Sequence, residues 1–122
     1  EDLMHSGDAI PKVFEDADSR LVIEEISKKR LGVTLVIDHS ENLKGMVTDG
    51  DLRRLMEKEK NVTQLKASNM MAKNPKTITK ETLAAKAVQI MEEHSITSLI
   101  VSDEGKIQGI IHLHDILKAG IV

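Results

Sequence analysis

An internal repeat constrains the fold of this 122-residue chain more than any other feature of its sequence. A gapless shift of 64 residues lays the second half of the chain on the first, and the apolar runs then coincide: "TLVI" falls on "SLIV", and "LKGMV" falls on "IQGII". Coinciding apolar runs and coinciding Gly and Pro positions indicate a duplicated folding unit. The identical pairs under this shift are Pro11 and Pro75, Lys12 and Lys76, Ile26 and Ile90, Leu35 and Leu99, Gly45 and Gly109, and Asp51 and Asp115.

Both copies of the repeat predict the same order of secondary structure. Each copy begins after its proline with a short extended segment, "KVF" or "KTI". A helix follows, capped by Asp18 or Ser19 in the first copy and by Thr79 or Thr82 in the second. Two apolar strands come next, joined by the polar turns "DHSEN" and "SDEGK", and a second helix begins at a Gly-to-Asp motif. The predicted order is therefore β-α-β-β-α, twice.

The predicted fold class is α+β, with the two repeats packed with pseudo-two-fold symmetry. A unit of about 57 residues buries too little apolar surface to be comfortably stable alone. The predicted strands are almost continuously apolar, as is typical of strands covered on both faces, so we expect the two sheets to face each other beside a cleft. We expect repeat 1 at 1–60, a linker with a short helix at 61–74, and repeat 2 at 75–122, all within one module.

The composition excludes several classes of function. The chain has no cysteine, which rules out disulfides and thiolate sites, and it has no P-loop and no HExxH motif. A net charge of −3 without a large block of one sign, and Phe14 as the single aromatic residue, argue against a nucleic-acid partner. No apolar run approaches the roughly 20 residues that span a bilayer, and no signal peptide is visible, so we expect no membrane partner and a cytoplasmic location. Because the chain begins at Glu1 without a methionine, we expect it to be a fragment of a longer protein.

Two passages carry the candidate chemistry, "GMVTDGDL" in the first copy and "GIIHLHDI" in the second. On spacing alone, His112, His114 and Asp115 suggest a metal site. Residues two apart face the same way only on a strand, however, and a strand that ends at His112 turns before His114. The sequence "DGD" resembles the start of a calcium loop, but Lys60 stands where the bidentate glutamate would be needed. We therefore predict no metal site.

The repeated aspartate has a structural interpretation and a functional one. As a helix cap, the Asp51 carboxylate would accept backbone N–H groups and contribute about 1 kcal/mol of stability. As a ligand site, the strand end presents the Thr48 hydroxyl and the Asp51 carboxylate beside a helix N-terminus, whose free N–H groups and positive dipole attract an anion. Sugar hydroxyls suit the carboxylate, and a phosphate suits the N–H groups. Arg53 and Arg54 either pair with that phosphate or are only solvated.

The repeated motif Gly-apolar-apolar-Thr-x-x-Asp between a strand and a helix resembles the CBS domain, and its tandem copies resemble the CBS pair, or Bateman module. "GMVTDGDL" matches this motif in full, whereas "GIIHLHDI" has His112 where Thr or Ser is usual. "SGDAIPKV" together with "TDGDLRR" resembles the C-terminal CBS pair of the D-arabinose-5-phosphate isomerase family, which supplies the precursor of Kdo, the acidic sugar of lipopolysaccharide and capsule. In that family a separate N-terminal sugar-isomerase domain carries the reaction. The resemblance therefore implies a regulatory fragment that is not itself an enzyme.

The resemblance also implies a ligand and a set of binding residues. The ligand would be a nucleotide or nucleotide-sugar, either an adenine nucleotide or CMP-Kdo, bound in the cleft between the repeats without a further cofactor. Its binding would modulate the attached isomerase domain of lipopolysaccharide biosynthesis. The alternative is an assembly module that forms a homodimer and whose clefts are vestigial. The binding residues implied are Lys12, Gly32, Val33, Thr34, Thr48 and Asp51 in the first site, and Lys76, Ile96, Thr97, Ser98, His112 and Asp115 in the second.

Overall fold

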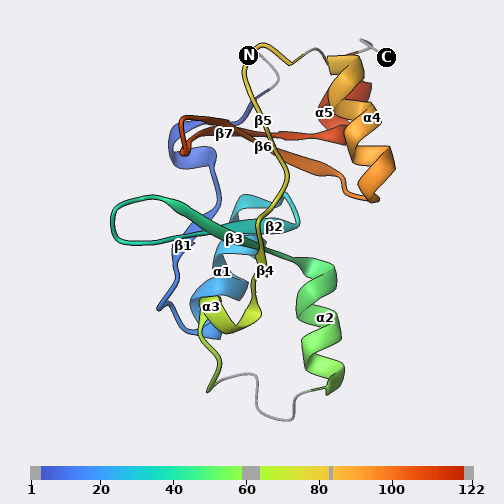
Figure 1. Ribbon diagram of the computed structural model, residues 1–122. Coiled ribbons are helices and arrows are strands. Elements are labelled where there is room, and N and C mark those ends of the chain that lie inside the picture. The colour runs from blue at the N-terminus through green and yellow to red at the C-terminus, as the bar shows by residue number, and fades with distance from the viewer. Residues whose placement is uncertain (1–3, 59–63, 83, 120–122) are drawn as a thin grey trace. The chain divides into compact units, whose positions relative to one another are not determined.

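The computed structural model describes residues 4–58, 64–82 and 84–119 (Figure 1). It separates into two compact units. The first-repeat unit is Pro11–Pro75, and the second-repeat unit combines Glu1–Ile10 with Lys76–Val122. Within the described ranges, no helix has both the length and the apolar character that crossing a membrane requires. Lys60 and residues 61–63 of the expected linker lie outside the described residues.

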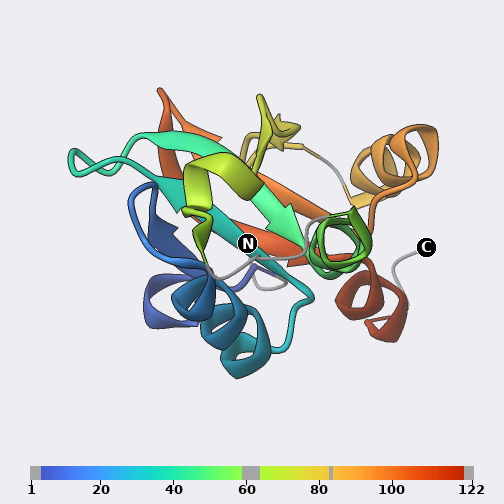
Figure 2. The ribbon, with the colours of Figure 1, turned by 90° about the horizontal axis from the view of Figure 1, so that it is seen from below.

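The first-repeat unit contains a four-stranded sheet in the order β1-β2-β3-β4. β1 runs parallel to β2, and the β2–β3 and β3–β4 pairs are antiparallel. Helix α1 packs against β1 and β2, and α3 packs against β3 (Figure 2). The elements are β1 (Lys12–Phe14), α1 (Ser19–Lys29), β2 (Val33–Ile37), β3 (Leu43–Thr48), α2 (Asp49–Lys58), α3 (Ala67–Met70) and β4 (Ala72–Lys73).

The second-repeat unit contains a three-stranded sheet in the order β5-β6-β7. β5 is parallel to β6, and β6 is antiparallel to β7. The elements are the short 3-10 helix η1 (Gly7–Ala9), β5 (Thr77–Ile78), α4 (Ala84–His94), β6 (Ser98–Asp103), β7 (Lys106–His112) and α5 (Leu113–Lys118). Together with the first unit, these elements confirm the α+β class and the β-α-β-β-α order of each repeat.

The local signals that begin and end the elements act as expected in several places. An Asp18 carboxylate oxygen accepts the Leu21 N–H at 3.1 Å and so caps α1. Gly105 has φ +80° in the turn between β6 and β7, a conformation that glycine adopts without strain. Thr79 or Thr82 is expected to cap α4. Leu83, directly before that helix, lies outside the described residues, so the predicted cap is not tested.

Each unit has its own hydrophobic core between its sheet and its helices. All five residues of β2 are buried, as its continuous apolar run predicts, and so are the first four residues of β6. The first core consists of Val22, Ile26, Val36, Val47, Leu52, Ala67 and Met70. The second consists of Ile78, Ala87, Met91, Leu99, Val101 and Ile116.

The strand pairing corrects the gapless alignment of the two repeats. Val36 in β2 pairs with Gly45 in β3, and Val101 in β6 pairs with Gly109 in β7. The two valines lie 65 positions apart and the two glycines lie 64 positions apart. The repeats therefore match with an offset of 65 before the hairpin turn and 64 after it. The identities at the prolines and at Leu35 and Leu99 are not structural equivalences.

The length of the hairpin turn explains this change of offset. Residues 38–42 separate β2 from β3, where the Asp38 carboxylate organises the turn by accepting the backbone N–H groups of Ser40 and Asn42 at 2.9 Å. These hydrogen bonds lower the pKa of the Asp38 carboxyl, the bond from Asn42 contributing most. The β6–β7 turn is tighter because only Glu104 and Gly105 separate the paired residues Asp103 and Lys106. Both turn residues have positive φ, as a two-residue hairpin turn of type I′ requires.

A segment from outside each β-α-β-β-α repeat extends its sheet. β4 pairs with β3 through Met46 and Ala72, and His5 pairs in the same antiparallel way with Ile110 in β7. At both contacts a glycine of the extended strand, Gly45 in β3 and Gly109 in β7, lets the added segment approach closely. A Cβ built on Gly45 would lie 2.6 Å from the Met71 sulfur and 2.7 Å from the Ala72 carbonyl oxygen.

This close approach predicts a large cost for adding one methyl group. Gly45→Ala should lower the free energy of unfolding by about 1–3 kcal/mol, because a backbone carbonyl has to move to make room. Urea denaturation of the two proteins measures the difference.

Gly50→Ala is the matched control for this substitution. A Cβ at Gly50, inside α2, would meet nothing nearer than the flexible Arg54 side chain at 3.4 Å. This variant should keep the stability of the unsubstituted chain or gain up to about 1 kcal/mol. Equal stability of the two variants would show that β4 moves away from β3 at little cost.

Candidate functional site

The motif of the first repeat forms a reciprocal hydrogen-bonded cap at the start of α2. The Thr48 N–H donates to Asp51 Oδ2 at 3.0 Å, and the Asp51 N–H donates to Thr48 Oγ1 at 3.1 Å. Each side chain thus satisfies the backbone donor of the other residue, in the manner of a capping box. The structural interpretation of Asp51 is therefore correct, and it leaves Oδ1 outside the cap.

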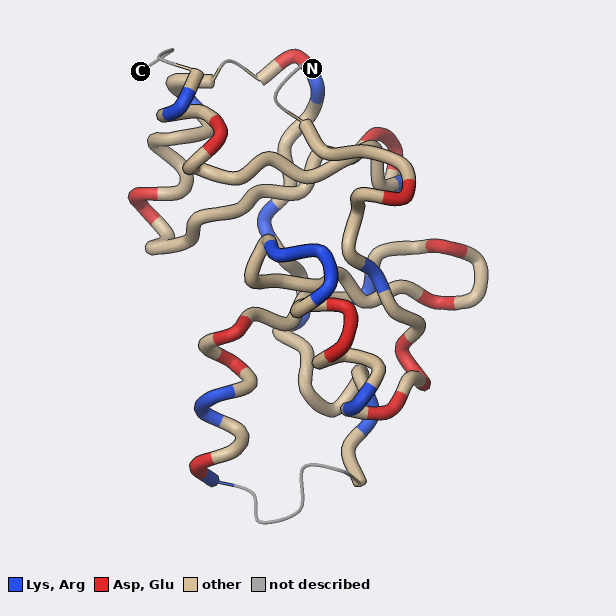
Figure 3. The backbone as a smooth tube through the Cα atoms, turned by 180° about the vertical axis from the view of Figure 1, so that it is seen from behind, with Lys and Arg blue, Asp and Glu red and all other residues tan. Residues whose placement is uncertain are grey.

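Arg54 forms an ion pair with Asp51 Oδ1. Its Nη2 donates to Asp51 Oδ1 at 2.6 Å, within one turn of α2. The arginine side chain is 64% exposed, whereas the aspartate is 23% exposed. Because exposed ion pairs contribute little to stability, a ligand hydroxyl can replace Arg54 at Oδ1 without a large penalty. Charges of both signs alternate along α2, as Figure 3 shows, so Arg54 is not part of a basic block.

The start of β2 lies directly beside this cap. The Asp49 N–H donates to the Gly32 carbonyl oxygen at 3.0 Å. Gly32 has φ +73°, and a Cβ there would lie 3.3 Å from Asp49 Oδ2, so this position favours glycine. Val33 and Thr34 follow as buried residues. The structure thus brings Gly32, Thr48 and Asp51 together in the first-repeat unit.

The second repeat places its equivalent groups in the same way, with one change of partner. The Leu113 N–H donates to the Thr97 carbonyl oxygen at 2.7 Å, which makes Thr97 the counterpart of Gly32. Ser98 then matches Val33 and is buried. Ile96 packs against the core of its own unit instead of starting the strand. The expected triplet of the second site is therefore shifted by one residue relative to the first.

His112 replaces the threonine of the motif and caps a different amide. Its Nδ1 accepts the His114 N–H at 3.1 Å, at the first turn of α5. Burial lowers the pKa of the His112 imidazole, nearby Asp115 opposes this effect, and His114 and His5 add to it. The ring is therefore neutral at pH 7 and offers hydrogen bonding without charge.

Asp115 has a partner that the sequence does not suggest. His5 Nε2 lies 2.7 Å from Asp115 Oδ2, across 110 positions of sequence. A carboxylate only accepts hydrogen bonds, so the imidazole nitrogen is the donor. No sequence spacing signals this contact, because His5 precedes the first repeat and reaches Asp115 only through its pairing with β7. Among the described residues, no group of three or more His, Asp or Glu side chains is arranged to hold a metal ion.

The two lysines of the expected sites are not equivalent. Lys12 lies in β1, its N–H donates to Glu25 Oε2 at 3.0 Å, and its Nζ lies 3.6 Å from Glu41 Oε1. Lys76 is exposed and precedes β5. The parallel pairing places Thr77, not Lys76, at the position of Lys12. The gapless shift therefore matched Lys76 with the wrong residue of the first repeat.

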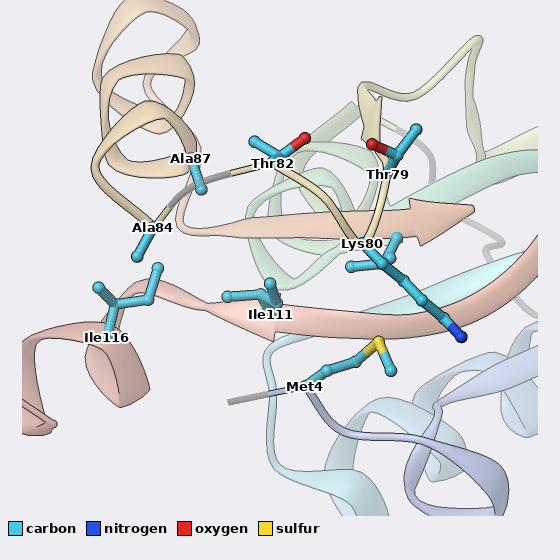
Figure 4. A pocket seen from close by; sticks show the side chains of 9 residues that line it. Met4, Thr79, Lys80, Thr82, Ala84, Ala87, Ile111 and Ile116 are labelled. Carbon is cyan, nitrogen blue, oxygen red and sulfur yellow. The ribbon is translucent and has the colours of Figure 1, made fainter. Parts of the chain in front are cut away.

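The second-repeat unit contains a small cavity (Figure 4). Its volume is about 70 Å³, and Met4, Ala87, Ile111 and Ile116 contribute apolar walls. None of the residues expected in either binding site lines it. Small-molecule sites typically measure about 300–1,000 Å³, so this cavity is too small for a nucleotide.

Known proteins resemble the chain in sequence and in fold. The CBS domain family matches residues 1–58 and 67–121. Arabinose 5-phosphate isomerase KdsD of Yersinia pestis is 39% identical over 121 residues, and that of Escherichia coli strain K12 is 37% identical. Both alignments cover 99% of this chain and 37% of the relative, so the chain spans little more than a third of those proteins.

A solved structure supports the fold assignment. CBSX2, a CBS-pair protein of Arabidopsis thaliana that was crystallised in complex with AMP, superposes with a TM-score of 0.82. The match covers 98% of this chain and 93% of that chain at 24% sequence identity. This likeness shows the shared fold.

The lowered pKa of His112 predicts how stability depends on pH. Between the folded-state pKa and the ordinary value near 6.5, the unfolded chain binds more protons at this residue than the folded chain. The stability contributed by neutral His112 is therefore complete above pH 6.5 and declines as the pH falls toward the folded-state pKa. His112→Thr should lose less stability than the unsubstituted chain between pH 7.5 and pH 5.5.

Urea denaturation at several pH values checks this expectation. Above about pH 7.5 the imidazole is neutral in both states, so the two stability curves should run parallel there. Parallel curves down to pH 5.5 would show that burial does not perturb His112.

Proposed function

The chain belongs to the CBS domain family as a tandem pair, and we propose that this pair binds a nucleotide or nucleotide-sugar and thereby regulates a sugar-phosphate isomerase domain attached to it. A CBS pair is a regulatory module and not an enzyme, and the isomerase relatives extend well beyond the part that it matches. The ligand we propose is an adenine nucleotide or CMP-Kdo. The compartment we propose is the cytoplasm, and the attached isomerase domain lies N-terminal to the pair.

The observation that carries the proposal is the meeting of the β2 start with the Thr48–Asp51 cap. The Gly32–Asp49 hydrogen bond holds a strand backbone beside a carboxylate that has one oxygen paired only with an exposed arginine. Ribose hydroxyls would donate to Asp51 Oδ1, while the base lies along the backbone of Gly32, Val33 and Thr34. The Asp49 and Asp51 N–H groups are bonded to Gly32 and Thr48, so the Thr48 hydroxyl and the positive end of the α2 dipole would face the phosphate. Lys12 would lie at the entrance.

The position of Arg54 gives it a role when a ligand replaces it at Asp51 Oδ1. A ribose that takes Asp51 Oδ1 displaces the guanidinium, which remains within one helical turn of the site. The freed cation is then available to the phosphate of the same ligand. The site thus keeps a cation beside the anionic phosphate when the ligand enters.

The second repeat would form a site of different strength. Its proposed residues are Asp115, His112, Thr97 and Ser98, with Ile96 and Lys76 nearby. His112 is neutral at pH 7 and supplies no hydroxyl, so this site would hold a phosphate less strongly than Thr48 and α2 do. The complex of CBSX2 with AMP supports a nucleotide as a ligand of this fold.

Regulation requires that the ligand bind two conformations of the pair with different affinity. A ligand that prefers one conformation shifts the population toward it, and the attached domain responds by the same coupling free energy. The sites proposed here join a strand to a helix in each repeat. Ligand binding would therefore act on the packing of elements and not on a single loop.

Exposed apolar side chains favour a second candidate role, assembly through a homodimer. Met56 on α2 is 59% exposed and Leu117 on α5 is 54% exposed. Dimerisation through these helices would cover both side chains. Analytical ultracentrifugation with and without ligand separates the two roles, because a dimer that binds no ligand supports assembly alone.

Titration with candidate ligands tests the proposed function directly. Isothermal titration with AMP, ATP, CMP and CMP-Kdo should give saturable heat for at least one of them, with a matching rise in melting temperature. Neither heat nor a thermal shift with any of the four would contradict a nucleotide-binding role.

Asp51→Ala separates ligand binding from helix capping. If Asp51 Oδ1 accepts a ribose hydroxyl, the substitution should weaken nucleotide binding by roughly 1.5–3 kcal/mol, the range for a hydrogen bond to a charged group. Asp18→Ala is the matched control, since Asp18 also caps a helix but lies outside the proposed site. Both variants should melt at lower temperature, and only Asp51→Ala should bind more weakly. Equal affinity of the two variants would restrict Asp51 to capping.

A further inference from the structure

The His5–Asp115 contact gives the second repeat a feature that the first repeat lacks. His5 Nε2 donates to Asp115 Oδ2 at 2.7 Å, and both side chains are only about one-third exposed, at 34% and 32%. Asp115 Oδ1 accepts no hydrogen bond from the residues that the structure describes. One oxygen of the carboxylate is thus held while the other remains available to a ligand.

The backbone fixes the position of His5 in this contact. The His5 N–H donates to the Ile110 carbonyl oxygen at 2.8 Å, and the Ile110 N–H donates back to the His5 carbonyl oxygen at 3.0 Å. Met4 and His5 also lie so close to Gly109 that a Cβ there would collide with both. The imidazole therefore reaches Asp115 from a segment that is hydrogen-bonded to β7.

The first repeat holds its own aspartate by different means. Asp51 Oδ2 accepts the Thr48 N–H, which belongs to the same motif. In the second repeat the described hydrogen bonds include none from the His112 N–H to Asp115, and the His112 ring instead accepts the His114 N–H. At the position equivalent to His5, the first repeat has Ala72, which has no side-chain donor. The hydrogen bond from His5 thus takes the place of the backbone N–H that holds the aspartate in the first repeat.

We propose that His5 is a positioning residue of the second-repeat nucleotide site, which holds Asp115 so that Oδ1 faces the ribose hydroxyls. This inference rests on the proposed function. Because linkage is reciprocal, a nucleotide that uses Asp115 also strengthens the docking of residues 4–10 on β7. In the proposed parent protein, this segment leads toward the attached isomerase domain. Occupancy of the second site is thus transmitted to residues 4–10, at the N-terminal side of the pair.

A comparison of His5→Leu with His5→Gln tests the positioning role. Both variants are made in the Asp51→Ala chain, where the second repeat keeps the only intact motif aspartate. Leucine preserves the backbone pairing with Ile110 and removes the donor, so AMP should bind about tenfold more weakly. Glutamine provides an amide donor, so its affinity should stay within about threefold of the Asp51→Ala parent.

A ligand without ribose hydroxyls shows whether His5 acts through Asp115. The two His5 variants should bind 2′,3′-dideoxy-AMP equally, since this nucleotide has no hydroxyl for the carboxylate. A merely structural role would weaken both nucleotides alike and would overturn the inference. If CMP is the nucleotide that binds the unsubstituted chain, CMP and its dideoxy form take the same place.

Amide hydrogen exchange gives an independent test if His5→Leu does not fold. In the unsubstituted chain, AMP should slow exchange at the His5 and Ile110 amides. Unchanged exchange at both amides in the presence of saturating AMP would overturn the inference. So would equal AMP affinity of the Asp51→Ala chain with and without His5→Leu, and either result would leave the proposed function standing. Absence of nucleotide binding by the unsubstituted chain would instead overturn the proposed function and this inference with it.

Discussion

A backbone hydrogen bond between a strand start and a helix start is the interaction on which both candidate sites depend. Asp49 donates to the Gly32 carbonyl in the first repeat, and Leu113 donates to the Thr97 carbonyl in the second. Each bond closes the open end of a β-hairpin, from the residue before its first strand to the residue after its second. Each therefore brings a strand backbone beside the motif aspartate. Without this bond, the motif spacing that the two repeats share would produce only a helix cap.

The two repeats share this frame but support their aspartates differently. In the first repeat, the reciprocal bonds of Thr48 and Asp51 are made entirely within one motif. In the second repeat, the threonine is replaced by His112, whose ring caps another amide, and Asp115 is held by His5 from the other end of the chain. The position of Asp51 therefore depends on neighbouring residues alone, whereas the position of Asp115 depends on the docking of the distant segment that contains His5. This difference is a physical reason why the two proposed sites would bind a ligand with unequal affinities.

Most of the secondary structure was predictable because its causes are local. The apolar runs, the Asp18 cap and the Gly105 turn each act over a few residues, and the structure has them where the sequence predicts. The correspondence between repeats was less predictable, since the β6–β7 hairpin is one residue shorter than β2–β3. Identical residues such as Leu35 and Leu99 favoured a gapless alignment, but strand pairing follows hydrogen bonds and not identity. The gapless alignment paired Ile96 with Gly32 and Lys76 with Lys12, whereas the structure pairs Thr97 and Thr77 with those residues.

The sequence by itself determined the duplicated β-α-β-β-α order, the family, and the positions of the two motif aspartates, because periodicity, turn residues and motif spacing are properties of short segments. Only the tertiary structure decided which atoms those aspartates bond. Arg54 was within reach of Asp51 by helical spacing, yet its choice of Oδ1 follows from the cap that already occupies Oδ2. His5 reaches Asp115 only because its backbone pairs with Ile110, and a pairing across more than 100 residues leaves no signal in a single sequence.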